Sequence, residues 1–393
     1  MRVLLATTTT PDDRKTVACT RALAKSGFWV AVGGDAFWGQ AFYTRSLSRR
    51  VHIPHPGLGI PRFIEAINEH IVRDHCDVVL PMNDYTTVAL TRNRDSLAPE
   101  VATALPPAKA LDVAGDKLQT QALAQGLGIE TPHTFAVKDE GDLREFSAQL
   151  EYPCVFKLRR GSGAVGMQVI QTRDQLLDTY QTPRGPSDMA FDREHVLVQE
   201  YVPGEVHDAC VVCEHGEIRA GLTQKRLRAY PAEGGIGTVV ETTQEPELLD
   251  RARTLLQALR WHGPAQVEFK IDPQTGRTWL LEINGRFWGS TGVAIRAGIN
   301  FPLLTCKLAL AEDLGSSPEY AVGLRYRFPF PFSLLALAEK GSRRQSLRDF
   351  FAPRRDTFSD LMWSDPLPLI AEVLYIGRRA WQRRSLQPVK QRL

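Results

Sequence analysis

The sequence predicts an α/β and α+β protein with more than one domain. Three features predict this fold class: apolar runs alternate with amphipathic helices over residues 2–82, a glycine-rich loop joins two strand-like runs at 152–172, and a hairpin at 263–290 carries acidic residues. The chain has 393 residues. Because domains usually hold about 100–200 residues, this length provides for about two or three of them.

The composition is that of an ordinary globular protein, with 43% hydrophobic and 24% charged residues and a formal net charge of +3. A net charge this small does not indicate a nucleic-acid partner. The opening residues lack the pattern of a secretory signal, and no run reaches the roughly 20 apolar residues that cross a bilayer. Six scattered cysteines indicate reduced thiols. We therefore expect a cytoplasmic protein that binds no nucleic acid.

The N-terminal segment predicts a parallel α/β sheet. Strands are expected at 2–10, 28–35 and 76–82, separated by helices at 12–27 and 61–75. Asn83 and Asp84 follow the last of these strands, at the sheet edge where open α/β sheets bind ligands. These two side chains are therefore candidates for substrate contact. The alternative is that Asp84 caps a helix beginning at Tyr85.

The next segment predicts a glycine-rich flap. After Pro106-Pro107, a helix from about Asp116 ends at the glycines near 126–128, and Asp116 is its expected cap. The motif Gly161-x-Gly163-x-x-Gly166 then lies between two strand-like runs rather than between a strand and a helix, which excludes a dinucleotide-binding fingerprint.

A strand–loop–strand flap of this kind can cover nucleotide phosphates, and the entering strand brings the cations Lys157, Arg159 and Arg160. The chain has no H-R-D or D-F-G signature, which excludes a protein kinase. The alternative is a solvated surface hairpin.

The second half of the chain predicts a mostly β region. Strands are expected within 195–226 and 234–242, followed by a helix at 245–261 and a hairpin of 263–272 with 276–290. Cys210 and Cys213 have C-x-x-C spacing, but on a strand these side chains point to opposite faces. With no completing ligand pair, we interpret them as core thiols.

The hairpin carries the sharpest chemical signal. Glu282 and Asn284 share one strand face, and the antiparallel partner strand can bring Glu268 beside them. Two carboxylates and an amide oxygen form a hard-oxygen site suited to Mg²⁺. A solvated strand face is the alternative, but apolar neighbours such as Leu281 and Ile283 disfavour it.

Taken together, these motifs resemble the ATP-grasp superfamily, in its carbamoyl-phosphate-synthase-like branch. The resemblance rests on Lys117, on Lys157 before the flap, on "VQEYVPGE" at 198–205, on Glu268, and on "LLEINGRFWGS" at 280–290. It implies an N-terminal pre-grasp domain at 1–105, a first lobe at 106–200, a second lobe at 201–315, and a C-terminal extension at 316–393.

The resemblance also implies roles for individual residues. ATP would be held by lysines, by the flap and by the hinge strand: Lys117, Lys157, Gly161, Ser162, Gly163, Gly166, Gln199, Glu200, Val202 and Glu205. Mg²⁺, as two ions or with Mn²⁺ in its place, would be held by Glu268, Glu282 and Asn284. Arg286, with Lys225 and Arg226 from an expected loop at 224–242, would stabilise charge during catalysis.

The activity that the resemblance implies is ATP-dependent ligation: a carboxylate is activated as an acylphosphate and then joined to an amine. The alternatives are a bicarbonate-activating enzyme of the carboxylase or carbamoyl-phosphate type, and a non-catalytic ATP-binding protein. The C-terminal segment can form a basic amphipathic helix, with Leu369, Val373, Ile376 and Trp381 among its apolar positions. It is expected to dock on its own domain, with peripheral membrane contact as the alternative. A homo-oligomer is also compatible with the sequence.

Overall fold

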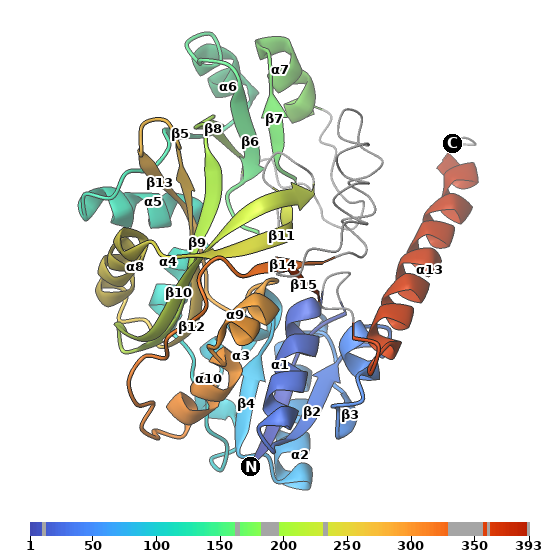
Figure 1. Ribbon diagram of the computed structural model, residues 1–393. Coiled ribbons are helices and arrows are strands. Elements are labelled where there is room, and N and C mark those ends of the chain that lie inside the picture. The colour runs from blue at the N-terminus through green and yellow to red at the C-terminus, as the bar shows by residue number, and fades with distance from the viewer. Residues whose placement is uncertain are drawn as a thin grey trace.

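The computed structural model shows a small parallel domain below a larger two-part β region (Figure 1). It describes residues 1–9, 13–161, 166–181, 196–230, 235–328, 357–359 and 362–390, with backbone alone from 379. Ser162 and Gly163 of the expected flap lie outside the described residues.

A four-stranded parallel sheet forms the N-terminal part, in the order β3-β2-β1-β4. Its strands are β1 (Arg2–Ala6), β2 (Trp29–Gly34), β3 (Arg49–His52) and β4 (Val78–Pro81). The expected strands and helices are confirmed, and β3 is an addition. Since only Val51 of β3 is buried, this edge strand carries no apolar pattern that the sequence could reveal.

Helices pack on both faces of this sheet and connect its strands. They are α1 (Arg14–Lys25), α2 (Ile60–Asp74) and α3 (Asp84–Arg92), with short 3₁₀ turns η1 (Gln40–Tyr43), η2 (Pro56–Leu58) and η3 (Arg94–Ser96). The cap of α3 differs from the expected one. Asn83, not Asp84, caps it, because its side chain accepts the Thr86 N–H in a capping box.

The largest sheet has seven strands in the order β13-β12-β9-β10-β11-β14-β15. They are β9 (Glu205–Glu214), β10 (Glu217–Tyr230), β11 (Ile236–Thr243), β12 (Gly263–Ile271), β13 (Thr278–Asn284), β14 (Arg325–Arg327) and β15 (Thr357–Ser359). The prediction of a loop at 224–242 is wrong. Residues 224–230 belong to strand β10, and β11 begins at Ile236.

The two faces of this sheet belong to different cores. Cys210 packs toward α10 (Phe301–Ala309), α9 (Thr291–Ala297) and the N-terminal sheet, while Cys213 packs toward α8 (Pro246–Ala258). Both cysteines are buried and free. Because successive side chains of a strand alternate between faces, the interpretation of this pair as core thiols is confirmed.

A smaller sheet in the order β5-β8-β6-β7 forms the upper lobe in Figure 1. Its strands are β5 (Thr134–Ala136), β6 (Cys154–Leu158), β7 (Gln168–Ile170) and β8 (Val196–Glu200). Helices α6 (Glu140–Phe146) and α7 (Arg173–Gln181) cover it, while α4 (Ala108–Ala114) and α5 (Lys117–Gly126) lead into it. The antiparallel pairing of β6 with β7 confirms the strand–loop–strand arrangement of the flap.

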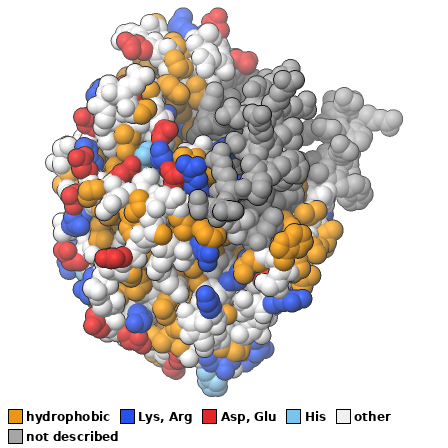
Figure 2. All heavy atoms as spheres, in the orientation of Figure 1, with side chains coloured by type: hydrophobic (Ala, Val, Ile, Leu, Met, Phe, Trp, Pro, Cys, Tyr) orange, Lys and Arg blue, Asp and Glu red, His pale blue; other side chains and the backbone are white. Residues whose placement is uncertain are grey.

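The C-terminal segment docks on the N-terminal sheet domain. Before α13 (Leu367–Lys390), Asp365 is buried and accepts hydrogen bonds from Arg21 Nε, Thr44 Oγ1 and the Arg45 N–H. Docking on its own domain is thus confirmed for this part of the segment. Figure 2 shows hydrophobic side chains gathered around the start of α13. Among the described helices, none combines the length and apolar character needed to span a membrane.

Candidate active site

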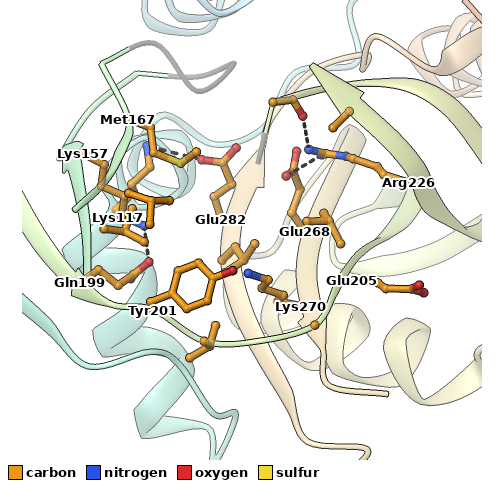
Figure 3. A pocket seen from close by; sticks show the side chains of 18 of the residues that line it. Lys117, Lys157, Met167, Gln199, Tyr201, Glu205, Arg226, Glu268, Lys270 and Glu282 are labelled. Carbon is orange, nitrogen blue, oxygen red and sulfur yellow. Dashed lines mark hydrogen bonds and ion pairs between the residues drawn. The ribbon is translucent and has the colours of Figure 1, made fainter. Parts of the chain in front are cut away.

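A cavity of about 430 Å³ lies between the upper lobe and the large sheet (Figure 3). The β6–β7 hairpin and α5 form one wall, and strands β9, β10, β12 and β13 form the other. Most of the residues that the sequence singled out gather here. They are Lys117, Lys157, Gly161, Gln199, Glu200, Val202, Glu205, Arg226, Glu268 and Glu282.

The register of the β12–β13 hairpin builds the acidic centre of the cavity. Glu268 lies directly opposite Glu282, and Gln266 lies opposite Asn284. The Nδ2 atom of Asn284 donates to Glu268 Oε1 at 3.0 Å and to Glu282 Oε1 at 3.3 Å. The shared face expected from the period of two is therefore confirmed as geometry.

Cations from other elements neutralise these carboxylates. An Arg226 guanidinium nitrogen lies 2.6 Å from Glu268 Oε2, and Lys117 Nζ lies 3.4 Å from Glu282 Oε2. Burial raises the pKa of Glu268 to about 7, although the positive charge of Arg226 opposes this rise; the negative charge of Glu282 adds to it. Burial also raises the pKa of Glu282, but Lys117, Lys157, the hydrogen bond from Asn284 and the charge of Arg226 together hold this pKa below its ordinary value. The centre thus contains two carboxylates with different proton affinities.

Lys157 occupies an unusual position for a lysine. Its Nζ donates to Gln199 Oε1 at 2.8 Å, and the residue is only 8% exposed. Burial, together with the positive charge of Lys117, lowers the pKa of Lys157 to about 7. An anionic ligand beside this ammonium group would reverse that effect, since a nearby opposite charge favours the charged form.

The base of the flap is tied to the start of α5. Asp116 caps α5 by accepting the Leu118 N–H at 3.1 Å, which confirms its expected role. The same carboxylate pairs with Arg159 at 2.8 Å and with Arg160 at 3.2 Å. Burial raises the pKa of Asp116, but the hydrogen bonds from Arg159 and Gln119 outweigh this effect and lower the pKa to about 2. The two flap arginines thus fix the hairpin to the helix that carries Lys117.

Two flap glycines adopt backbone angles that other residues rarely adopt. Gly161 has φ of 120° and Gly166 has φ of 74°. Residues with a Cβ atom are disfavoured at such positive φ angles, whereas glycine has no Cβ. Gly161 lines the cavity and its carbonyl accepts a hydrogen bond from Lys117 Nζ at 2.7 Å, whereas Gly166 packs against Leu158.

The apolar side of the cavity was not predicted from the sequence. Here the lining consists mainly of aliphatic side chains and one aromatic ring: Val155, Leu158, Met167, Val169, Tyr201, Val206 and Leu281. Lys270 was also missed. It is half-buried, with Nζ 4.6 Å from the centre of the Tyr201 ring. Since Lys270 is two residues after Glu268 on β12, strand alternation could have predicted that it shares the cavity.

A second, polar cavity of about 140 Å³ adjoins the first and shares Arg226, Glu268 and Glu282 with it. Asn284 and Arg286 line this polar cavity. Arg286 donates through Nε to Asp84 Oδ1 at 3.1 Å and through a terminal nitrogen to Asn284 Oδ1 at 3.1 Å. A metal ion bound through Asn284 Oδ1 would therefore replace a hydrogen bond from Arg286.

Two further residues reach the polar cavity from the N-terminal domain. Arg14 and Lys15 begin α1 and are buried. Their approach depends on how the N-terminal sheet packs against the large sheet, so no local sequence pattern reveals it. The signal available was their place just after β1, at the carboxyl edge of a parallel sheet.

Some expected site residues lie elsewhere. Lys225 pairs with Glu205 at 3.2 Å and lines neither cavity, because neighbouring residues on a strand point to opposite faces. Arg228 does line the main cavity. Figure 3 shows Glu205 directed away from the cluster formed by Lys117, Lys157 and Glu282.

The donor set suits a hard cation. Glu268, Glu282 and Asn284 offer oxygen atoms on one face, as Mg²⁺ prefers. Among the described residues, no group of three or more His, Cys, Asp or Glu side chains could hold a metal ion. The oxygen set consists instead of two carboxylates and one amide.

Comparison with known proteins agrees with this geometry. Residues 116–317 match the family model described as "Carbamoyl-phosphate synthase L chain, ATP binding domain". A D-alanine–D-alanine ligase of Pseudomonas putida is 25% identical over 182 residues, which is 44% of this chain and 54% of the ligase. A propionyl-CoA carboxylase alpha chain of Ruegeria pomeroyi is 24% identical over 190 residues, which is 46% of this chain and 28% of the carboxylase. The chain thus spans about half the length of the ligase.

Solved structures share the fold. Biotin carboxylase from Campylobacter jejuni in complex with an ATP analogue superposes with a TM-score of 0.66 at 15% identity, covering 82% of this chain and 74% of that one. An L-amino acid ligase from Bacillus licheniformis superposes with a TM-score of 0.58 at 16% identity, covering 79% and 74%. At such identities the likeness shows the fold alone.

Proposed function

Because the chain belongs to the ATP-grasp superfamily, in the family of carbamoyl-phosphate-synthase-type ATP-binding domains, we propose that it is an ADP-forming ligase. It activates a carboxylate as an acylphosphate and joins it to an amine. The observation that carries this proposal is the centre made by Glu268, Glu282 and Asn284, with Lys117 and Lys157 beside it in a cavity of about 430 Å³.

ATP lies across the main cavity in this proposal. Its adenine contacts the apolar side formed by Met167, Tyr201 and Leu281, and the backbone after β8 reads its edge. The side chain of Glu200 already accepts the His133 N–H at 3.1 Å, which favours backbone rather than side-chain recognition there. Lys117 and Lys157 contact the phosphates of ATP. The flap glycines allow the backbone of the flap to approach these phosphates.

Mg²⁺ is held by Glu268, Glu282 and Asn284 in this proposal, and it neutralises phosphate charge when bound. We propose that two ions would bind here and that Mn²⁺ could replace them, since Mn²⁺ also accepts oxygen ligands. Arg226 then exchanges its contact with Glu268 for one with the transferred phosphoryl group.

The reaction divides into two steps. A carboxylate oxygen attacks the γ-phosphorus of ATP and ADP leaves, which forms the acylphosphate. The amine then attacks the acyl carbon, loses a proton, and displaces inorganic phosphate. Arg286 and Arg226 offset the negative charge of the transferred group, and enclosure by the flap excludes water from the acylphosphate.

Bicarbonate activation is the second candidate, because carboxylases stand among the similar proteins and structures. Bicarbonate would take the place of the carboxylate in the first step. A small inorganic acid needs no large acceptor cavity, so substrate size discriminates between the candidates.

The test is ADP and phosphate release from MgATP by the purified full chain, with pools of carboxylic acids and amines and, separately, with bicarbonate. We expect release that depends on both an organic acid and an amine, together with a new amide mass. Release with bicarbonate alone would favour the second candidate. Tight MgATP binding without release in any pool, including bicarbonate, would contradict both and favour a non-catalytic ATP-binding protein.

A further inference from the structure

A third cavity, of about 420 Å³, lies between the N-terminal domain and the C-terminal segment. Its walls come from α1, from α9, from β14 and β15, and from residues 362–372. Most of the lining is apolar, including Val17, Ala18, Ile295, Phe358 and Leu369. We call it the apolar cavity.

The three cavities adjoin one another, since neighbouring cavities share lining residues. The polar cavity shares Arg226, Glu268 and Glu282 with the proposed ATP cavity, and it shares Arg14 and Gly289 with the apolar cavity. A molecule that occupied both the polar and the apolar cavity would have one end near the acidic centre and would lie beside Arg14. The order is phosphates, then a polar passage, then an apolar space.

The charges in the polar passage suit an anionic head group. Its lining holds four cationic side chains, those of Arg14, Lys15, Arg226 and Arg286, and two carboxylates, those of Glu268 and Glu282. The Arg14 guanidinium is held in place, since it stacks 4.0 Å over the Phe328 ring and reaches the Gly237 carbonyl at 3.5 Å. A guanidinium fixed in this way is well suited to binding a carboxylate.

The far wall of the apolar cavity is held by a buried ion pair. Asp365 binds Arg21 at 3.0 Å and the Arg45 N–H at 3.0 Å, which anchors the segment that carries Trp363 and Leu369. Residues 362–372 of the C-terminal segment thus form one wall of the apolar cavity.

We propose that the carboxylate substrate is amphipathic: its carboxylate lies in the polar passage beside Arg14 and Arg286, and its aliphatic or aromatic body fills the apolar cavity. This inference rests on the proposed ligase function and names the substrate class for it. A body of several carbons buried there should improve kcat/KM by about tenfold or more over acetate, because each methylene group in an apolar pocket contributes on that scale.

The first test measures activity. Wild type is compared with Ile295→Trp, which fills the apolar cavity from α9, and with Leu303→Trp as control, since Leu303 is half-buried on α10 and lines none of the three cavities. The acids are acetate and 3-phenylpropionate, with hydroxylamine as the amine that traps the acylphosphate as a hydroxamate. We expect 3-phenylpropionate to be preferred by wild type and by the control, and to lose at least about tenfold in Ile295→Trp. Equal use of both acids by all three proteins would overturn the inference.

The second test needs no turnover, which separates this inference from the ligase proposal. The fluorescent amphipathic anion 8-anilinonaphthalene-1-sulfonate should bind wild type and Leu303→Trp and be displaced by 3-phenylpropionate. It should bind Ile295→Trp at least about tenfold more weakly. Displacement by 3-phenylpropylamine as effective as by the acid would contradict the anionic head group. If binding follows the expected pattern and no acid yields hydroxamate, the ligase proposal fails while the amphipathic-anion site stands.

Discussion

Arg226 on β10 reaches across β9 to Glu268 on β12, with 2.6 Å between a guanidinium nitrogen and Oε2. The Arg226 side chain is 14% exposed and that of Glu268 is 12% exposed. A pair this buried is costly to break from one side, because the remaining charge loses both water and its partner. Arg226 therefore supplies the positive charge beside Glu268 when no Mg²⁺ is bound.

Arg226→Met should destabilise the metal-free protein by about 3–5 kcal/mol, the usual cost of removing one partner of a buried pair. Mg²⁺ should restore part of the loss, since it can replace the missing positive charge beside Glu268. Urea denaturation with and without Mg²⁺ measures both effects. Arg219, on the same strand as Arg226, forms a more exposed pair with Glu214 of β9; Arg219→Met is therefore the control and should change stability by less than about 1 kcal/mol. A variant as stable as wild type without Mg²⁺ would contradict the role given to Arg226.

Glu282→Gln should lower the rate of ADP formation by about 100-fold or more, the scale on which a charge-stabilising group contributes to catalysis. The amide keeps the shape but not the charge that faces Lys117 and the proposed metal ion. Steady-state ADP release over a range of Mg²⁺ concentrations measures this, with Glu247→Gln on α8 as the matched control outside the site. Normal turnover by Glu282→Gln would remove this residue from the metal site.

Lys157 should make nucleotide affinity depend on pH. Its pKa is about 7 in the free protein, and bound phosphates raise it. Below pH 7 the ammonium is charged in both states, so affinity is highest there. As pH rises above 7, only the complex keeps the proton, so affinity falls by up to about tenfold per pH unit until the pKa of the complex is reached.

Calorimetry in buffers of different ionisation enthalpy should detect proton uptake on MgATP binding between pH 7 and 8.5. Lys157→Arg is the control, because arginine stays charged throughout this range. The titration of the nucleotide itself is common to both proteins and cancels in the difference. Identical pH profiles for the two proteins would show that Lys157 is charged in the free protein.

Local patterns predicted the acidic centre and the flap well. The period of two on β12 and β13 was enough to bring Glu268, Glu282 and Asn284 together, because a hairpin fixes its own register. The cap at Asp116 was also local. These features depend on residues close in the sequence, which is why the sequence reveals them.

The contacts that failed prediction are long-range. The resemblance to the family implied a loop around Arg226, yet β9 and β11 flank this residue as part of a long strand. Arg14 and Lys15 enter the site only through packing between sheets. Asp84 was weighed as a cap, but Asn83 fills that role and Asp84 pairs with Arg286, which is 202 residues away in the chain.

Asp116→Asn separates two roles of one side chain. Asparagine caps helices about as well as aspartate, so α5 should remain intact. Asparagine has no negative charge to pair with Arg159 and Arg160. The base of the flap should therefore be held less firmly, and the dissociation rate of MgATP should rise several-fold. Stopped-flow release of a fluorescent ATP analogue measures this rate. Faster release with unchanged helix content is the expected outcome, and an unchanged release rate would exclude a role of these pairs in nucleotide retention.

Asp365→Ala tests the anchor of the C-terminal segment. Removing this carboxylate leaves the largely buried Arg21 and the Arg45 N–H without their acceptor, at a cost of about 1–3 kcal/mol. The segment before α13 should then become sensitive to limited proteolysis, and 3-phenylpropionate should lose affinity because the apolar cavity loses a wall. Asp313→Ala serves as the control, since its side chain is 88% exposed. Resistance to proteolysis equal to wild type would show that packing around α13, rather than Asp365, holds this wall in place.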